Sequence, residues 1–126
     1  MGTRALIHIK DESKTIATIY RHYDGYPEGL GMELKDILSG STVPEGYLRN
    51  YQKKEDFYNG MGCLAAYIIS SLKKEWGNVY IYPPNSRDCG EEFVYLVELN
   101  QDNKLTLSTM VVYNEDRKLA ETTIFE

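Results

Sequence analysis

The feature that most restricts the fold of this chain is a strand-like run that ends abruptly in a turn sequence. Thr15–Tyr23 is rich in β-branched and aromatic residues, which predicts a strand. Asp24-Gly25 favours a turn, because glycine tolerates positive φ and aspartate hydrogen-bonds its own backbone. Pro27 suits the first turn of a helix, where its missing N–H costs no hydrogen bond. The run Arg21–Glu28 therefore predicts a strand-to-helix junction.

Hydrophobic spacing on either side of the junction predicts the other elements. Ala5–Ile9 has the pattern of a strand that forms a hairpin with Thr15–Tyr23. Apolar residues at helical spacing predict one helix from Pro27 to a stop at Gly40 and a second over about Asn59–Trp76. Further strands are expected at Val79–Tyr82, Phe93–Leu99, Leu105–Tyr113 and, after a turn at Asn114–Lys118, Leu119–Phe125. Together they predict one α+β domain over residues 1–126, an antiparallel sheet of five or six strands with both helices packed on one face.

Length and charge narrow the class of protein. A chain of 126 residues is the size of one domain. Its formal charge of −5 argues against general nucleic-acid binding, which needs a basic surface. The longest apolar stretch, Met61–Ile69, is much shorter than the roughly 20 residues of a membrane-spanning helix, so no membrane association is expected. No secretory leader opens the chain, and we expect free thiols at Cys63 and Cys89 and a cytoplasmic location.

His22 and Asp24 form the first candidate site. If the strand continues through Asp24, both side chains lie on the same face, two residues apart. The histidine can then act as a general acid or base whose tautomer the carboxylate fixes, or the pair can be two ligands of a metal. Catalytic zinc normally takes three protein ligands, and the other histidine, His8, is on the first strand. A structural role, with Asp24 capping the helix that follows, is favoured over these chemical roles.

Arg21 and the tyrosines beside it offer a second possibility, an anion-binding surface. A guanidinium next to Tyr20 and Tyr23 can hold a phosphate or stack on a base. The junction also ends at a helix N-terminus in a glycine-rich stretch, and helix N-termini attract anions. Glu28 at the same helix start opposes an anion. The spacing matches neither the P-loop nor the dinucleotide-binding motif.

A second cluster of functional residue types follows the double proline at residues 83–84. It reads Arg87-Asp88-Cys89-Gly90-Glu91 and lies in a polar loop. Its spacing does not match a Ser-His-Asp or Cys-His arrangement, and two cysteines alone make neither a zinc site nor a redox motif. A solvated loop is the alternative interpretation.

Residues Tyr20–Glu28 resemble the core of a family of short bacteriophage and prophage proteins. The sequence reads Y-R-H-Y-D-G-Y-P-E, and the family core is Y-x-H-[WY]-D-G-Y-P-E. The opening strand at Arg4–Ile9 and the later Asp88-x-Gly90-Glu91 resemble other parts of that family. The family has no settled activity, so the resemblance implies a context only, an accessory protein made in a host cytoplasm. Such proteins can counter host defences by binding a defence protein or by sequestering a signalling nucleotide.

These observations favour a non-enzymatic binding protein, a host-defence antagonist that binds a host protein or a small anionic, nucleotide-derived ligand. The candidate ligand contacts are Tyr20, Arg21, His22, Asp24, Tyr26, Arg87 and Asp88. The alternative is a small hydrolase or metal-dependent enzyme that uses His22 and Asp24, and a third hypothesis gives the motif only a folding role. No cofactor, metal ligand or catalytic residue is assigned. Eleven tyrosines, residues suited to binding surfaces, predict a homo-oligomer.

Overall fold

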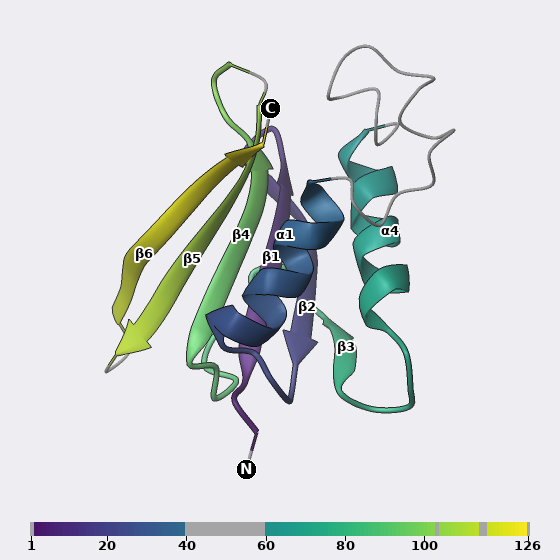
Figure 1. Ribbon diagram of the computed structural model, residues 1–126, viewed down its shortest axis with the longest axis vertical. Helices are drawn as coiled ribbons and strands as arrows, with labels where there is room; N and C mark the ends of the chain where they lie inside the picture. Colours follow the sequence, from purple (N-terminus) through teal and green to yellow (C-terminus); the bar gives the residue numbers. More distant parts are fainter. Residues whose placement is uncertain (1, 40–59, 103, 114–115, 126) are drawn as a thin grey trace.

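The computed structural model describes residues 2–39, 60–102, 104–113 and 116–125, which form an α+β fold on a six-stranded sheet (Figure 1). The predicted helix stop at Gly40 and helix start at Asn59 lie outside the described residues. The strands are β1 (Ala5–Asp11), β2 (Lys14–Arg21), β3 (Val79–Tyr82), β4 (Phe93–Leu99), β5 (Leu105–Tyr113) and β6 (Asp116–Phe125). The predicted α+β class with five or six strands is confirmed.

The sheet has the strand order β3-β2-β1-β4-β5-β6. Both predicted hairpins, β1–β2 and β4–β5, pair antiparallel, as do β2–β3 and β5–β6. The central pair β1–β4 is parallel, with His8 opposite Leu96, so the sheet is mixed and not antiparallel throughout. A parallel pair needs a crossover connection, which periodicity along the chain does not reveal.

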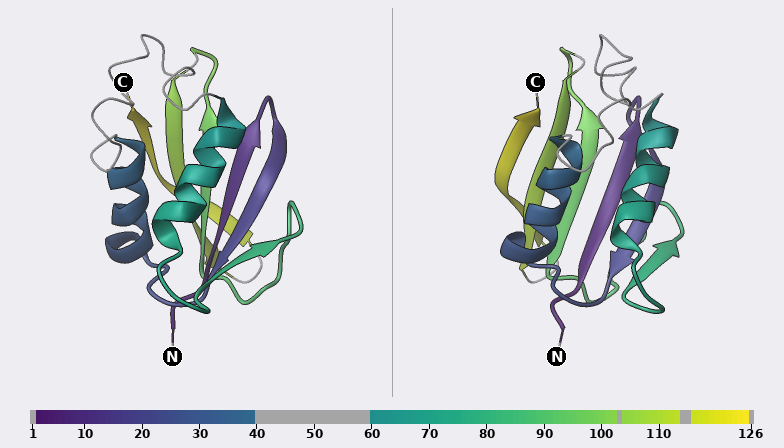
Figure 2. Two further views of the ribbon diagram at one scale, coloured as in Figure 1. Left: turned by 90° about the vertical axis from the view of Figure 1, so that its right-hand side faces the viewer. Right: turned by 45° about the vertical axis from the view of Figure 1, so that its right-hand side comes forward.

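The helices lie together on one face of the sheet (Figure 2). A π-helical turn, η1 (Pro27–Gly31), continues into α1 (Met32–Leu38), and α4 (Met61–Leu72) packs over β1 and β2. Odd-numbered residues of β1 face the helices because side chains alternate along a strand. The core between the layers includes Ile7, Ile9, Ile19, Leu30, Leu34, Leu64, Ile68, Tyr95, Val97 and Leu107. The opposite side of the sheet is called the open face below.

Several element boundaries differ from the predicted ones. β2 ends at Arg21, two residues early, and Asp24 adopts a positive φ of 57°. α4 ends at Leu72 because Lys73 is extended. The Lys73 ammonium donates to the carbonyls of Gly77, in the turn that follows, and Val79, the first residue of β3, at 2.8 and 2.9 Å. β6 starts at Asp116, inside the predicted turn, because β5 provides cross-strand partners as far as Tyr113.

The strand-to-helix junction is fixed to the sheet at Gly25. The Gly25 N–H donates to the Thr3 carbonyl at 2.9 Å, and the buried Tyr95 hydroxyl donates to the Gly25 carbonyl at 2.7 Å. A Cβ at Gly25 would lie 2.7 Å from both the Thr3 oxygen and the Ala5 Cβ, so this close approach requires glycine. Burial raises the pKa of Tyr95, which keeps its hydroxyl a hydrogen-bond donor.

We expect Tyr95→Phe to lower the free energy of unfolding by about 1–3 kcal/mol, because it leaves the buried Gly25 carbonyl without its donor. Urea unfolding followed by circular dichroism measures this difference. Tyr113→Phe is the matched control, since Tyr113 is exposed near the end of β5 and should tolerate the same change. Equal stabilities of the two variants would contradict an anchoring role for Tyr95.

Candidate functional site

The segment 83–92, which joins β3 to β4, runs along the open face of the sheet. The Asn85 N–H donates to Thr18 Oγ1 at 3.0 Å, and the Glu92 N–H donates to the Arg4 carbonyl at 2.8 Å. Thr18 pairs with His8 across β1 and β2, and His8 points away from the helix-covered core formed by its neighbours Ile7 and Ile9. The segment therefore covers strand positions that a sheet with one bare face would leave in water.

A cavity of about 320 Å³ lies beside this segment. Its wall is formed by β1, β4, β5, the edge strand β6 and the segment 83–92. The residues that line it are His8, Lys10, Leu96, Met110, Arg117, Asn85 and Arg87. Three of these side chains are cationic, in a chain whose overall charge is −5. The fold has thus collected positive charge at one place on an otherwise acidic protein.

His8 is buried at this cavity with one ring nitrogen bonded and the other free. Its side chain is only 5% exposed, and Nδ1 lies 2.8 Å from Thr18 Oγ1. Thr18 Oγ1 accepts the Asn85 N–H and keeps a second lone pair, so its hydroxyl can either donate to His8 Nδ1 or accept from it. His8 Nε2 is buried and has no hydrogen-bond partner among the described residues. His8 therefore presents an unpaired ring nitrogen to the cavity.

Arg117 adds an unpaired donor to the same cavity. Its Nη2 atom is buried without a hydrogen-bond partner in the described residues. The Glu91 carboxylate lies 3.6 Å away, which makes an ion pair but exceeds hydrogen-bonding distance. Glu91 is itself buried and accepts the Cys89 N–H at 2.7 Å. Glu91 offsets part of the positive charge and leaves the Nη2 N–H groups of Arg117 available.

Burial and the positive charges of the cavity both act on the acidity of His8. Burial, together with the charges of Arg117, Lys10 and Arg87, lowers the pKa of His8 from 6.5 to about 4. Glu91 acts the opposite way and does not compensate. His8 is consequently a neutral imidazole at physiological pH, beside three cationic side chains.

The structure separates the residues of the Tyr20–Glu28 motif between the two faces. Arg21 is buried on the helix side, where its Nη2 pairs with Glu33 Oε2 at 2.8 Å and its Nε donates to the Tyr23 carbonyl. The Asp24 carboxylate accepts a long bond of 3.4 Å from the Tyr26 hydroxyl, and its backbone carbonyl accepts the Leu30 N–H. The expected helix cap by the Asp24 side chain is absent, since the residue at the cap position is Tyr26.

Tyr20 and His22 belong to an aromatic cluster on the open face. The Tyr20 hydroxyl is 2.8 Å from His22 Nδ1, and its ring stacks on Tyr82 at a centroid distance of 4.9 Å. Tyr80 and Tyr23 complete the cluster. Since β2 ends at Arg21, strand alternation does not bring Asp24 beside His22, and His22 bonds to Tyr20 instead. Tyr20, His22, Asp24 and Tyr26 stay predicted ligand contacts.

Of the second predicted cluster, Arg87 lines the basic cavity and Asp88 does not. Cys89 follows Asp88 in this segment. Burial and the carboxylates of Glu91 and Asp88 raise the pKa of its thiol, which makes it a weak nucleophile. Sequence reasoning missed His8, Lys10 and Arg117. His8 and Lys10 alternate with the core residues Ile7 and Ile9, which is a usable signal for polar groups on one face, but Arg117 lay in a predicted turn.

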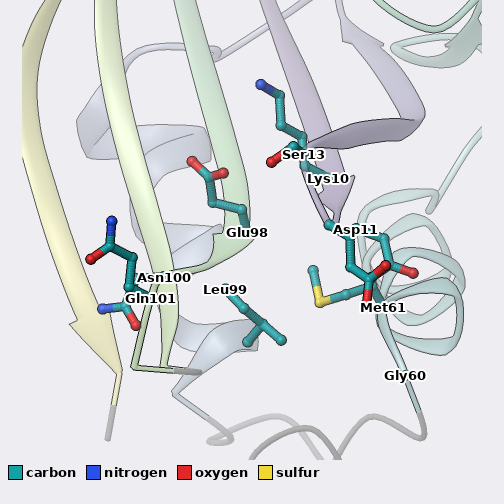
Figure 3. A pocket seen from close by; sticks show the side chains of 10 residues that line it. Lys10, Asp11, Ser13, Gly60, Met61, Glu98, Leu99, Asn100 and Gln101 are labelled. Carbon is teal, nitrogen blue, oxygen red and sulfur yellow. The ribbon is translucent and has the colours of Figure 1, made fainter.

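Other hollows of the surface are less specific. One of about 490 Å³ lies at the far end of β1, where Lys10, Asp11, Glu98 and the amides of Asn100 and Gln101 mix opposite charges (Figure 3). The ammonium of Lys10 points away from Asp11 and Met61 in this view. Another, of about 430 Å³, is lined by Arg4, His22, Tyr23 and Glu92 among others. In neither do the described residues supply a buried donor without a partner.

Comparisons with known proteins add no assignment. The chain matches no protein-family model, no curated protein and no solved structure. Among the described residues, no group of three His, Cys, Asp or Glu side chains is arranged to hold a metal ion. Within the same ranges, no helix has the length and apolar character needed to cross a membrane.

We expect the low pKa of His8 to make the protein less stable in mild acid. The unfolded chain takes up a proton near pH 6.5, whereas folded His8 does so only near pH 4, so stability falls as pH decreases through this window. The loss from this group is at most about 3 kcal/mol. Urea unfolding of wild type and His8→Gln at pH 8, 6, 5 and 4, in buffers without phosphate, measures it. Relative to pH 8, the variant should lose less stability, and parallel curves would contradict the assignment.

Proposed function

We propose that this protein is a non-enzymatic binding protein that sequesters a small anionic ligand in the basic cavity on the open face. One observation carries the proposal: two buried nitrogen atoms, His8 Nε2 and Arg117 Nη2, line the same cavity and lack hydrogen-bond partners among the described residues. We propose that the ring proton of His8 is on Nε2, so that both atoms are donors. A buried donor without an acceptor costs about 1–3 kcal/mol, so an acceptor from outside the chain stabilises this arrangement. Lys10 and Arg87 favour an anionic acceptor over a neutral one.

Binding fits the cavity better than catalysis does. Its lining includes cations, an amide and two apolar side chains, without a hydroxyl or thiol nucleophile among these described residues. The volume of about 320 Å³ is at the small end of ligand pockets and suits a phosphate or a compact phosphorylated molecule. Neutral His8 and the forked guanidinium groups can donate several hydrogen bonds to one phosphate.

The resemblance of Tyr20–Glu28 to phage proteins supports a biological setting for this activity. An accessory protein in a host cytoplasm can antagonise a defence pathway by lowering the concentration of an anionic signalling molecule. The basic cavity supports this form of the hypothesis over the binding of a host protein, because it supplies recognition for a small charged group.

Inorganic phosphate is the probe that tests the proposal. In long-range ¹H–¹⁵N spectra of the histidine rings, phosphate should shift the Nε2 resonance of His8 in a saturable way. Arg117→Gln should weaken binding about tenfold or more in calorimetry, because it removes a charge-assisted hydrogen bond. Lys118→Gln is the matched control: it removes the same charge from the adjacent position, on the other face of β6, and should leave affinity within about twofold.

Arg117→Gln also leaves Glu91 without its ion-pair partner, so it can weaken binding by destabilising the fold. A second pair of variants, which leaves this ion pair intact, separates the two effects. Lys10→Gln should weaken phosphate binding several-fold, whereas Lys14→Gln, at the exposed start of β2, should not. The proposal would be overturned if, in both pairs, the variant and its control bound phosphate with equal affinity. It would also be overturned if phosphate did not shift the His8 resonance.

A further inference from the structure

The basic cavity continues into an apolar surface on the same face of the sheet. Leu96 of β4 and Met110 of β5 are part of the cavity wall and are half-buried. Met110 pairs across β5 and β6 with Leu119, whose side chain is 65% exposed. These three residues, here called the apolar shelf, run from the anion site towards the free edge of β6.

We infer that the ligand is a phosphate monoester with an aromatic body, whose phosphate enters the cavity while its ring lies on the apolar shelf. This inference rests on the proposed function. The shelf is uncharged, so the phosphate of the ligand must be held by the adjoining anion site. Leu96, Met110 and Leu119 together offer a continuous apolar surface beside the cationic cavity, which a ligand can cover on binding. The shelf and the cavity together then recognise one amphiphilic molecule.

Size and surface chemistry favour a ring over a polar body. The shelf covers two strand spacings, roughly 10 Å, which is the length of a one- or two-ring aromatic group. Side chains of a sheet make a flat surface, and the Met110 thioether makes favourable contacts with aromatic rings. Nucleotides belong to this class of ligand, as do simpler aryl phosphates.

Calorimetry with two dianions of equal charge tests the inference. Phenyl phosphate should bind about tenfold more tightly than glycerol phosphate, because its ring removes apolar surface from water. Leu119→Ser should bring this ratio towards one and leave the affinity for glycerol phosphate unchanged. Ile124→Ser is the matched control: Ile124 is 53% exposed on the same strand, but it pairs with Thr106, outside the cavity wall, and its loss should preserve the ratio.

The outcomes separate the inference from the function on which it rests. If neither dianion binds, the proposed function is overturned. Equal binding of the two dianions would leave the anion site standing and overturn the aromatic ligand. A second copy of this chain is the other possible occupant of the shelf, and sedimentation of the wild type and Leu119→Ser tests for it. A dimer that the substitution dissociates would mean that a second copy covers the shelf, and would also overturn the inference.

Discussion

The parallel pairing of β1 with β4 constrains everything that is built on the open face of this sheet. The chain leaves β3 next to β2 and must start β4 next to β1, so the connection passes two strands. The helices occupy one face, and the segment 83–92 takes the other, where its backbone is fixed to Thr18 and Arg4. This path converts exposed positions of β1 and β2 into buried ones.

Burial of polar groups is costly unless their hydrogen bonds are made, and this region makes only some of them. Asn85, Thr18 and His8 form a chain of bonds that ends at a ring nitrogen without a partner in the described part of the chain. Arg117 and Glu91 approach each other without closing a hydrogen bond. A region selected for stability alone would satisfy these groups or replace them by apolar ones, whereas a recognition site keeps them available for a ligand.

The motif at residues 20–28 has a different physical role in the described structure. Gly25 brings the chain close to β1 and β4, and the Arg21–Glu33 pair joins the end of β2 to α1. The positive charge of Arg21 is therefore paired within the protein, with the carboxylate of Glu33. On the other face, the Tyr20 hydroxyl and His22 Nδ1 are hydrogen-bonded, and the Tyr20 ring contacts Tyr80 and Tyr82 of β3.

Local chemistry along the sequence was enough to determine the elements of this protein: the hairpins, the junction at Asp24-Gly25, the helix start at Pro27 and the α+β class all follow from alternation, helical spacing and turn residues. It also identified Arg87 as a candidate ligand contact. Only the tertiary structure decided that β1 pairs parallel with β4, and that His8, Lys10, Arg87 and Arg117 meet in one cavity. The physical reason is that these residues come from β1, the crossing segment and β6, and long-range strand pairing, which no local pattern encodes, brings them together.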